Sequence, residues 1–349
     1  MQLKISDMMN DLLPEEDLLP PTAKTPDYDL SRVKSLVRSH LAQNEPTSLP
    51  RRHRAARSTR WLTAAAAILL FTGTAFAAVH FQWDEALRGY LQPTDKQLEE
   101  LTPAGVNIDQ TITSDGTTVT VRQVLGDKYG VYILLDITAP EGVVLDDTCR
   151  FEKNYLRFTS PTDEPMSMGY GMTVLTNDDA PANTISALFD LNASSSLVGT
   201  TAHLKLENLQ HYILGPDGDF ETIAEGTWEF EWPMNYTDLS QTTNINQPLA
   251  LLDDRDTLTS VTLSPLSLTL TVQGPGAQQA SDDPETDLSS FNETDAIYLL
   301  TTNSKIPLPW QTIGTSANGD TLLITYTFGK ILDTAAITGL ELNGQRIPF

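Results

Sequence analysis

A long apolar run stands out in a chain whose polar and apolar positions otherwise alternate over short distances. Residues 61–81 read WLTAAAAILLFTGTAFAAVHF and contain no Asp, Glu, Lys or Arg. About 20 apolar residues are enough for a helix to cross the roughly 30 Å hydrocarbon core of a bilayer. Trp61 and Trp83 lie near the two ends of the run, where indole rings favour the membrane interface. The pattern therefore predicts a single transmembrane helix over residues 61–81, in contact with the lipid bilayer.

Two other interpretations of this run compete with a membrane span. The first is a buried helix of a soluble domain. The second is a late secretory signal, since Ala75-Phe76-Ala77 has the small-x-small pattern of a cleavage site. A signal peptide normally begins within the first few residues, whereas here 50 residues precede even the basic region. We favour an uncleaved anchor for that reason.

The flanks of the run differ in charge, and the difference predicts its orientation. Asp84 and Glu85 follow the run, with a single arginine, Arg88, nearby. The ten residues before it contain no acid and five arginines, which we take to set the topology: Arg51, Arg52, Arg54, Arg57 and Arg60. By the positive-inside rule the N-terminus is cytoplasmic and the C-terminal part is exported, which places the protein in the cell membrane.

Residues 1–60 are too few and too polar for a sizeable core, and they contain two short amphipathic patterns. Each pattern has the spacing of one apolar helix stripe, Ile5, Met8, Met9, Leu12 and Leu13 in the first and Leu30, Val33, Val37 and Leu41 in the second. Isolated helices of this length are marginal in water, so the stripes need something to pack against. Two interpretations stay open: docking on a cytoplasmic partner, or pairing of the two helices with each other.

Residues 82–104 have the pattern of a juxtamembrane helical segment. WDEALRGYL is compatible with a continuation of the membrane helix as far as Pro93. Thr94 then opens TDKQLEEL, in which Thr94 and Gln97 fit a capping box.

From Val106 onwards the hydrophobic period changes to two, which is typical of strands. Asp115-Gly116 lies between alternating segments and predicts a tight hairpin. YGVYILLDITAP is continuously apolar, which favours a central strand buried on both faces. Further strands are expected in FEKNYLRFTS, TISALFDLN, AHLKLENLQHYI and GTWEFEWPMNY. Short strands without long helices between them predict a β-sandwich over residues 105–237.

A second β-sandwich is expected over residues 238–349, after the polar stretch TDLSQTTNINQP. Its strands would be TLTSVTLSPLSLTLTVQG, AIYLLTTN, DTLLITYTF and ITGLELNGQRIPF. The acidic stretch PGAQQASDDPETDLSSFNETD is interpreted as a long loop. The predicted fold is therefore mainly β: a short helical cytoplasmic arm, one transmembrane helix and two exported β-sandwiches in series.

Composition excludes several classes of protein. Acidic residues outnumber basic ones 46 to 22 over 349 residues, and the formal charge is −24. Residues 82–349 alone carry 38 acidic and twelve basic side chains. Such an excess argues against direct nucleic-acid binding, because phosphate backbones require Lys and Arg. The single cysteine, Cys149, excludes an internal disulfide framework and a cysteine-rich zinc site.

No catalytic signature emerges from the candidate residues. The chain has no G-x-S-x-G elbow, no H-E-x-x-H motif and no Gly-rich phosphate loop. His203 and His211 lack a surrounding motif, and Cys149 is interpreted as a small packed residue. Trp228 and Trp232 fall on one face of a strand, which favours a core over a sugar platform. The sequence predicts a protein that is not an enzyme and has no cofactor and no metal site.

Acidic clusters are the residues that could offer carboxylate oxygens to a calcium ion. They comprise Asp217 with Asp219, Asp253 with Asp254 and Asp256, and Asp282 with Asp283. None has the spacing of an EF-hand loop, so solvated turns are favoured over calcium sites.

The order of these features resembles the single-pass membrane proteins of Gram-positive bacteria identified as anti-sigma factors of the extracytoplasmic-function type. The resemblance is carried by TDKQLEELTPAGVNIDQTITSDGTTVTVRQVLGDKYGVYILLDI and GTWEFEWPMNY, and by SVTLSPLSLTLTVQG and ITGLELNGQRIPF, which look like the Ig-like second domain of such proteins. It implies that residues 1–60 sequester a sigma factor and that the exported domains sense an unknown envelope ligand or protein. The arm has no cysteine, so it departs from the zinc-binding members with their His-x-x-x-Cys-x-x-Cys motif.

The hypothesis from sequence is thus a membrane-anchored regulator that resembles an anti-sigma factor. The main alternative is an envelope-tethered binding or structural protein without a transcription role. An exported hydrolase is the third class, for which no paired carboxylates are marked.

Overall fold

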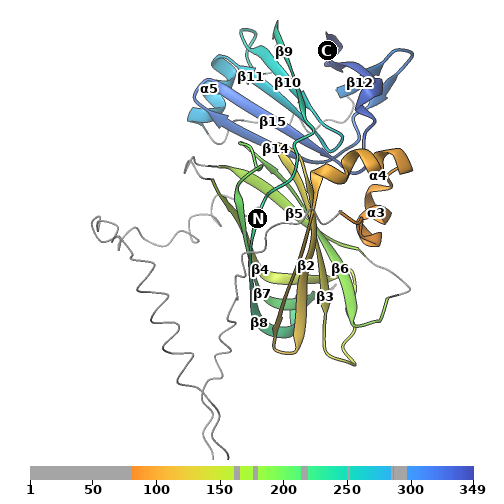
Figure 1. The fold of residues 1–349 in the computed structure, drawn as a ribbon. Helices are drawn as coiled ribbons and strands as arrows, with labels where there is room; N and C mark the ends of the chain where they lie inside the picture. The colour runs from red at the N-terminus through yellow and green to blue at the C-terminus, as the bar shows by residue number, and fades with distance from the viewer. Residues whose placement is uncertain are drawn as a thin grey trace, which may run out of the picture. The chain divides into compact units, whose positions relative to one another are not determined.

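A computed structural model describes residues 81–160, 166–175, 180–213, 219–249, 252–283, 286 and 297–349. These residues belong to one compact unit, Gly73–Phe349. They form a mainly β fold of antiparallel strands with short helices, as predicted (Figure 1). The predicted cytoplasmic arm and residues 61–80 of the predicted membrane span lie outside the described residues. Within the described residues no helix is both long and apolar enough to cross a bilayer.

The first half of the fold consists of two sheets. The larger sheet has the strand order β1-β2-β3-β6-β5 and contains β1 Gly105–Ser114, β2 Thr117–Gly126, β3 Gly130–Thr138, β5 Met168–Leu175 and β6 Thr184–Ala193. The smaller sheet has the order β4-β7-β8 and contains β4 Cys149–Thr159, β7 Thr201–Tyr212 and β8 Phe220–Pro233. We refer to these two sheets as the first β unit.

One apolar core lies between the two sheets of the first β unit. It includes Val121, Ile133 and Phe189 from the larger sheet and Leu204 and Trp228 from the smaller one. Trp228 and Trp232 are both buried on the same side of β8, so the prediction that they belong to a core is confirmed.

Two local predictions in this unit are also confirmed. The hairpin between β1 and β2 turns at Asp115 and Gly116, whose φ angles are 48° and 74°. Positive φ at both central residues is the type I′ geometry that matches the twist of the strands. The next strand, β3, pairs with β2 on one side and β6 on the other, and its first six residues are buried.

The second β unit begins at Gln241 and again has two sheets over one core. One sheet has the order β14-β15-β11-β10-β9 and contains β9 Gln241–Pro248, β10 Thr257–Leu263, β11 Ser267–Gln273, β14 Trp310–Asn318 and β15 Thr321–Phe328. The other has the order β13-β12-β16-β17 and contains β12 Ile297–Thr301, β13 Lys305–Pro307, β16 Ile337–Leu342 and β17 Gln345–Pro348. Leu270, Ile324 and Tyr326 share a core with Leu299 and Leu340.

The structure corrects the predicted loop that follows β11. Its first residues form helix α5, Pro275–Asp282, in which proline occupies an early helical position. Proline suits the first turn of a helix because its missing N–H would have no partner there. Ala277 of α5 is fully buried, which ties this segment to the core of the second β unit.

Two short helices precede the first strand. They are helix α3, Glu85–Leu91, and helix α4, Asp95–Leu101, and the 3-10 turn η1, Thr102–Ala104, follows them. Another 3-10 turn, η4, Thr334–Ala336, precedes β16 in the second β unit. The predicted capping box of α4 is present, with Thr94 and Gln97 each bonded to the other's backbone. The possible continuation of a membrane helix through residues 82–91 is wrong, because α3 begins afresh at its own N-cap. Asp84 has an extended backbone there, and its carboxylate accepts the Ala86 N–H.

Candidate functional site

The predicted partner-binding and topology residues lie outside the described residues. They are Ile5, Met8, Met9, Leu12, Leu13, Leu30, Val33, Val37 and Leu41, and the arginines Arg51, Arg52, Arg54, Arg57 and Arg60. The described part of the chain starts where the predicted membrane span ends. The candidate site is therefore the segment from Phe81 to Ala104 and the surfaces on which it packs, which we call the junction.

An apolar cluster holds the junction in place. Phe81, Leu87, Leu91 and Leu101 are each at most 8% exposed and belong to one cluster. The cluster takes Leu125, Tyr132, Leu134 and Leu188 from the first β unit and Leu266 and Ile331 from the second. Phe81 was the last residue of the predicted span, and the structure assigns it instead to this core. Burying four such side chains is worth several kcal/mol by the usual transfer values.

The junction covers the outer face of the larger sheet, which explains why β3 is buried on both sides. Val131, Ile133 and Leu135 face the core of the first β unit, whereas Tyr132 and Leu134 face the junction. Alternate side chains of a strand point to opposite faces, so a continuously apolar strand needs cover on both. α3 and α4 supply that cover on the outer face (Figure 1).

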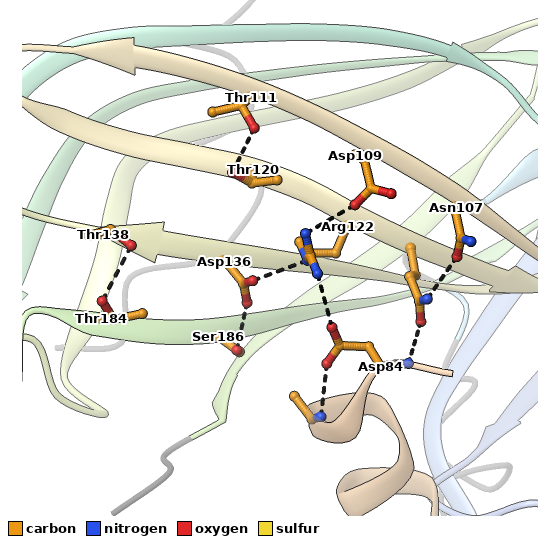
Figure 2. Close-up of polar contacts among 12 residues, drawn as sticks. Asp84, Asn107, Asp109, Thr111, Thr120, Arg122, Asp136, Thr138, Thr184 and Ser186 are labelled. Atoms are coloured by element: carbon orange, nitrogen blue, oxygen red, sulfur yellow. Dashed lines mark hydrogen bonds and ion pairs between the residues drawn. The ribbon is translucent and has the colours of Figure 1, made fainter. Parts of the chain in front are cut away.

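A cluster of charged side chains connects the start of α3 to the sheet. The Arg122 guanidinium lies 3.1 Å from Asp109 Oδ1, 3.2 Å from Asp136 Oδ2 and 3.7 Å from Asp84 Oδ2 (Figure 2). One cation thus faces three carboxylates. Burial raises the pKa of Asp136, and the neighbouring Asp84 and Asp109 raise it further, while the Ser186 hydroxyl and Arg122 act in the opposite direction.

Two β-bulges bring these charges together. The β1–β2 register shifts between Asn107 and Gln110, and Asp109 has a φ of 50°. The β2–β3 register shifts between Val121 and Gln123, which makes Arg122 the extra residue of its strand. A bulge re-aims a side chain and leaves it outside the regular ladder. A bulge leaves no mark in the hydrophobic pattern, so sequence reasoning missed this cluster. The adjacent residues Asp84 and Glu85 were interpreted only as a signal of membrane topology.

Gln123 fixes the backbone that enters α3. Its Oε1 accepts the Asp84 N–H at 2.9 Å, and its Nε2 donates to the Gln82 carbonyl and, at 2.8 Å, to Asn107 Oδ1. Gln123 is only 6% exposed. A buried amide whose hydrogen-bonding groups are all satisfied holds its partners in one position, so Gln123 fixes the backbone at Gln82 and Asp84.

A buried carboxylate joins the two β units next to the junction. Asp127, in the turn between β2 and β3, is 1% exposed. Its Oδ1 accepts the N–H groups of Tyr129 and Gly130, and its Oδ2 accepts the hydroxyls of Ser264 and Ser267 from the second unit. Burial raises the pKa of Asp127, and the four hydrogen bonds oppose that rise.

Further contacts complete this connection. The Tyr132 hydroxyl donates to the Phe328 carbonyl, and Gln97 Nε2 of α4 donates to the Ile331 carbonyl at 3.3 Å. Asn192 of β6 lies directly against Gly314 of β14, where a side chain larger than hydrogen would overlap it. The recess beside this contact has no titratable side chain in its lining, which combines hydroxyls, an amide and glycines with the apolar side chains of Met168, Ala193 and Leu323.

The acidic clusters and the cysteine have the following environments. Asp253 accepts two hydrogen bonds from the Arg255 guanidinium, which holds the pKa of that carboxyl below its usual range. Asp256 is buried rather than solvated, and it accepts the Gly276 N–H. Cys149 is 3% exposed, so its interpretation as a packed residue is confirmed, and burial raises the pKa of its thiol to about 11.

Comparisons with known proteins give a distant structural similarity. No protein-family model matches the chain, and no curated protein matches it. Among solved structures, the chain is similar to a conserved domain protein from Bacillus anthracis, with 16% identity and a TM-score of 0.46. The similarity covers 72% of this chain and 81% of that one.

Proposed function

We propose that the protein is a single-pass membrane regulator that resembles an anti-sigma factor of the extracytoplasmic-function type. Residues 1–60 sequester a sigma factor in the cytoplasm, and residues 61–80 cross the bilayer. The two β units are exported, Ig-like β-sandwiches that sense the envelope. The cytoplasmic side of this topology rests on the arginines of residues 51–60 and the positive-inside rule.

The observation that carries the proposal is the position of the junction. The first described residue after the proposed span, Phe81, is already buried in a core shared by both β units. Four residues later α3 begins, held by Asp84, Gln123 and the Arg122 cluster. A regulator needs its sensing part to be attached firmly to its membrane segment, because a loose tether transmits no change in position. A protein that only displays a binding domain has no need of such an attachment.

The proposed mechanism is occlusion. The apolar stripes that contain Met9 and Leu12, and Val33 and Val37, occupy a surface that the sigma factor needs for transcription. A ligand of the β units that shifts the junction would alter the exposure or the assembly of the arm. Such a ligand shifts this equilibrium only by as much as its affinity differs between the two states.

The test is a set of chromosomal variants of the full-length chain in the native host. Deleting residues 2–50 retains the arginines of residues 51–60 and therefore the topology. We expect the deletion to raise transcription from one set of promoters, and capture of the intact chain from solubilised membranes to recover a sigma factor. Replacing Met9, Leu12, Val33 and Val37 by Asp should abolish that recovery.

Each outcome distinguishes the proposal from its rival. Unchanged transcription in the deletion strain, with the protein shown to be present and correctly oriented, would favour an envelope-tethered binding protein. Recovery of a sigma factor that survives the four Asp substitutions would place the contact elsewhere in the arm.

A further inference from the structure

Three side chains of different chemistry meet at one end of the smaller sheet of the first β unit, away from the junction residues named above. Cys149 begins β4, and His211 lies directly opposite it in the register of β7. Asp146 precedes Cys149 by three residues, in a turn closed by the Cys149 N–H to the Asp146 carbonyl at 3.2 Å. One ligand atom from each of the three lies within 4.8 Å of the others.

Two distances among these atoms match edges of a tetrahedral metal site. His211 Nδ1 lies 3.6 Å from Cys149 Sγ and 3.4 Å from Asp146 Oδ1. Zinc bonds of about 2.3 Å to sulfur and about 2.0–2.1 Å to nitrogen and oxygen, at tetrahedral angles, place S and N about 3.5 Å apart and N and O about 3.3 Å apart. The two distances from His211 Nδ1 are therefore those expected between ligand atoms of a tetrahedral zinc site.

The second nitrogen of the imidazole fixes the tautomer. His211 Nε2 lies 3.1 Å from the Val144 carbonyl oxygen, which can only accept, so Nε2 carries a hydrogen. In the neutral ring Nδ1 then presents a lone pair toward the thiol and the carboxylate. A backbone carbonyl that accepts the distal N–H of a ligating histidine is the usual outer-shell arrangement of metal sites.

We infer that Asp146, Cys149 and His211 form a binding site for a divalent cation of the zinc class. The ligand set has one thiolate, one imidazole and one carboxylate, and it leaves a fourth position for water or another ligand. Asp146 is half-exposed at 50%, so the site is reached from solvent. The inference does not depend on the proposed regulatory function.

This site departs from the expectation that the chain binds no metal. Sequence reasoning missed it because Cys149 and His211 are 62 positions apart and become neighbours only through the β4–β7 register. Binding would expel a proton from the buried thiol, because the thiolate is the form that ligates a metal. The rival explanation is an ordinary pair in which a protonated His211 donates to Asp146 and to the Thr148 hydroxyl, 3.1 Å from Nδ1.

The experiment is a cobalt(II) titration of the full-length chain, purified in detergent and stripped with a chelator. Thiolate-bound cobalt gives a charge-transfer absorption in the near ultraviolet, and Cys149 is the only thiol in the 349 residues. We expect this band to saturate at one cobalt per chain, to be bleached by one equivalent of zinc and to be accompanied by proton release. Zinc should also raise the Tm of the chain.

Variants then assign the ligands. Cys149→Ser should abolish the band, and His211→Gln and Asp146→Asn should weaken cobalt binding at least about 10-fold, the lower range for loss of a metal site's supporting groups. The matched control is His203→Gln, since His203 lies on the same strand but pairs with Glu231 and Thr159 instead. Its band should equal that of the wild type.

Two results would overturn the inference. The first is absence of the band from the wild-type chain at a large excess of cobalt, which needs no variant to fold. The second is a band that His211→Gln leaves unchanged, which would show a thiolate site built from other residues.

Discussion

At the scale of single residues, Arg122 shows how one side chain fixes the entry of a chain segment. It is the only cation within 4.0 Å of Asp84, Asp109 or Asp136 in the described part of the chain. Like charges without a counter-ion repel, and Asp136 is already partly desolvated. The guanidinium is 40% exposed, so solvent reduces the net value of these ion pairs.

We therefore predict that Arg122→Met lowers the free energy of unfolding by about 1–2 kcal/mol. The control is Arg346→Met. Arg346 is far from Arg122 in the sequence, its side chain is 76% exposed, and it pairs with Glu341. That change should cost less than about 0.5 kcal/mol. Urea unfolding followed by tryptophan fluorescence would measure both, and equal costs would show that the Arg122 cluster adds nothing beyond a surface pair.

Asp127 leads to a prediction about pH. Burial raises the pKa of this carboxyl above its unfolded value of about 3.9. A folded state that binds the proton more tightly gains stability as the proton binds. The stability from this group is thus fully present below the unfolded pKa and is lost as pH rises through the folded pKa. Each unit of separation between the two pKa values corresponds to about 1.4 kcal/mol.

The matched variant is Asp127→Asn, which keeps the shape and one acceptor but does not titrate. The stability of the wild type minus that of Asp127→Asn should increase as pH falls from 7 toward 4. Denaturant unfolding at several pH values measures this difference, and groups common to both proteins cancel. A difference that stays constant or falls on acidification would mean that Asp127 is ionised as easily in the fold as outside it.

At the scale of elements, sequence reasoning succeeded where a local rule decides the structure. The type I′ hairpin at Asp115-Gly116 and the capping box of α4 follow from two residues each. The apolar run of β3 predicted burial on both faces. It did not predict what covers the outer face, because α3 and α4 reach it only through tertiary packing.

The missed elements have a common physical reason. β9 reads QTTNINQP, β5 reads MGYGMTVL and β14 reads WQTIGTSAN, so Gly, Asn, Gln and Pro weaken their strand pattern. β9 and β5 are edge strands, and β14 is the edge of the sheet that contacts the first β unit. Edge strands are hydrogen-bonded to a neighbour on one side only, so their sequences are less constrained than those of central strands. The N-cap of α3, Asp84, was also missed, because the apolar run directly before it made residues 83–91 look like a continuation of the membrane helix.

Gly314 supports a prediction about contact between the elements β6 and β14. A methyl group at this position would overlap the Asn192 side chain, which is 5% exposed and has little room to move. Gly314→Ala should destabilise the fold by about 1–3 kcal/mol through overpacking. Adding Asn192→Ala should recover most of that loss, since it removes the atoms that clash.

The control is Gly89→Ala in α3. Its added carbon meets no atom within 4 Å, and alanine is the better helix former by about 0.5–1 kcal/mol. Gly89→Ala should therefore stabilise slightly. A double-mutant cycle between Gly314→Ala and Asn192→Ala that shows no coupling would mean that the two β units do not meet at this contact.

At the scale of the whole molecule, the two β units are expected to unfold as one. Asp127 joins the β2–β3 turn to Ser264 and Ser267, Tyr132 bonds to Phe328, and the junction cluster contains side chains of both units. Buried polar groups that lose a partner cost about 1–3 kcal/mol each. Separating the units would expose these polar groups and the apolar cluster together. Unfolding of one unit alone therefore has a high free-energy cost.

Leu270→Ala in the second unit tests this coupling from a distance. Leu270 is fully buried in the core of that unit, and its truncation should cost about 2–5 kcal/mol. Hydrogen exchange at β8, which contains Trp228 and Trp232, reports on the core of the first unit, whereas hydrogen exchange at β15 reports on the core of the second. If the units unfold together, the substitution shifts both signals to the same lower denaturant midpoint, as a two-state transition requires. A shift confined to β15 would show that the units unfold independently, and a change in the second unit would then have no route through the junction to the segment before Phe81.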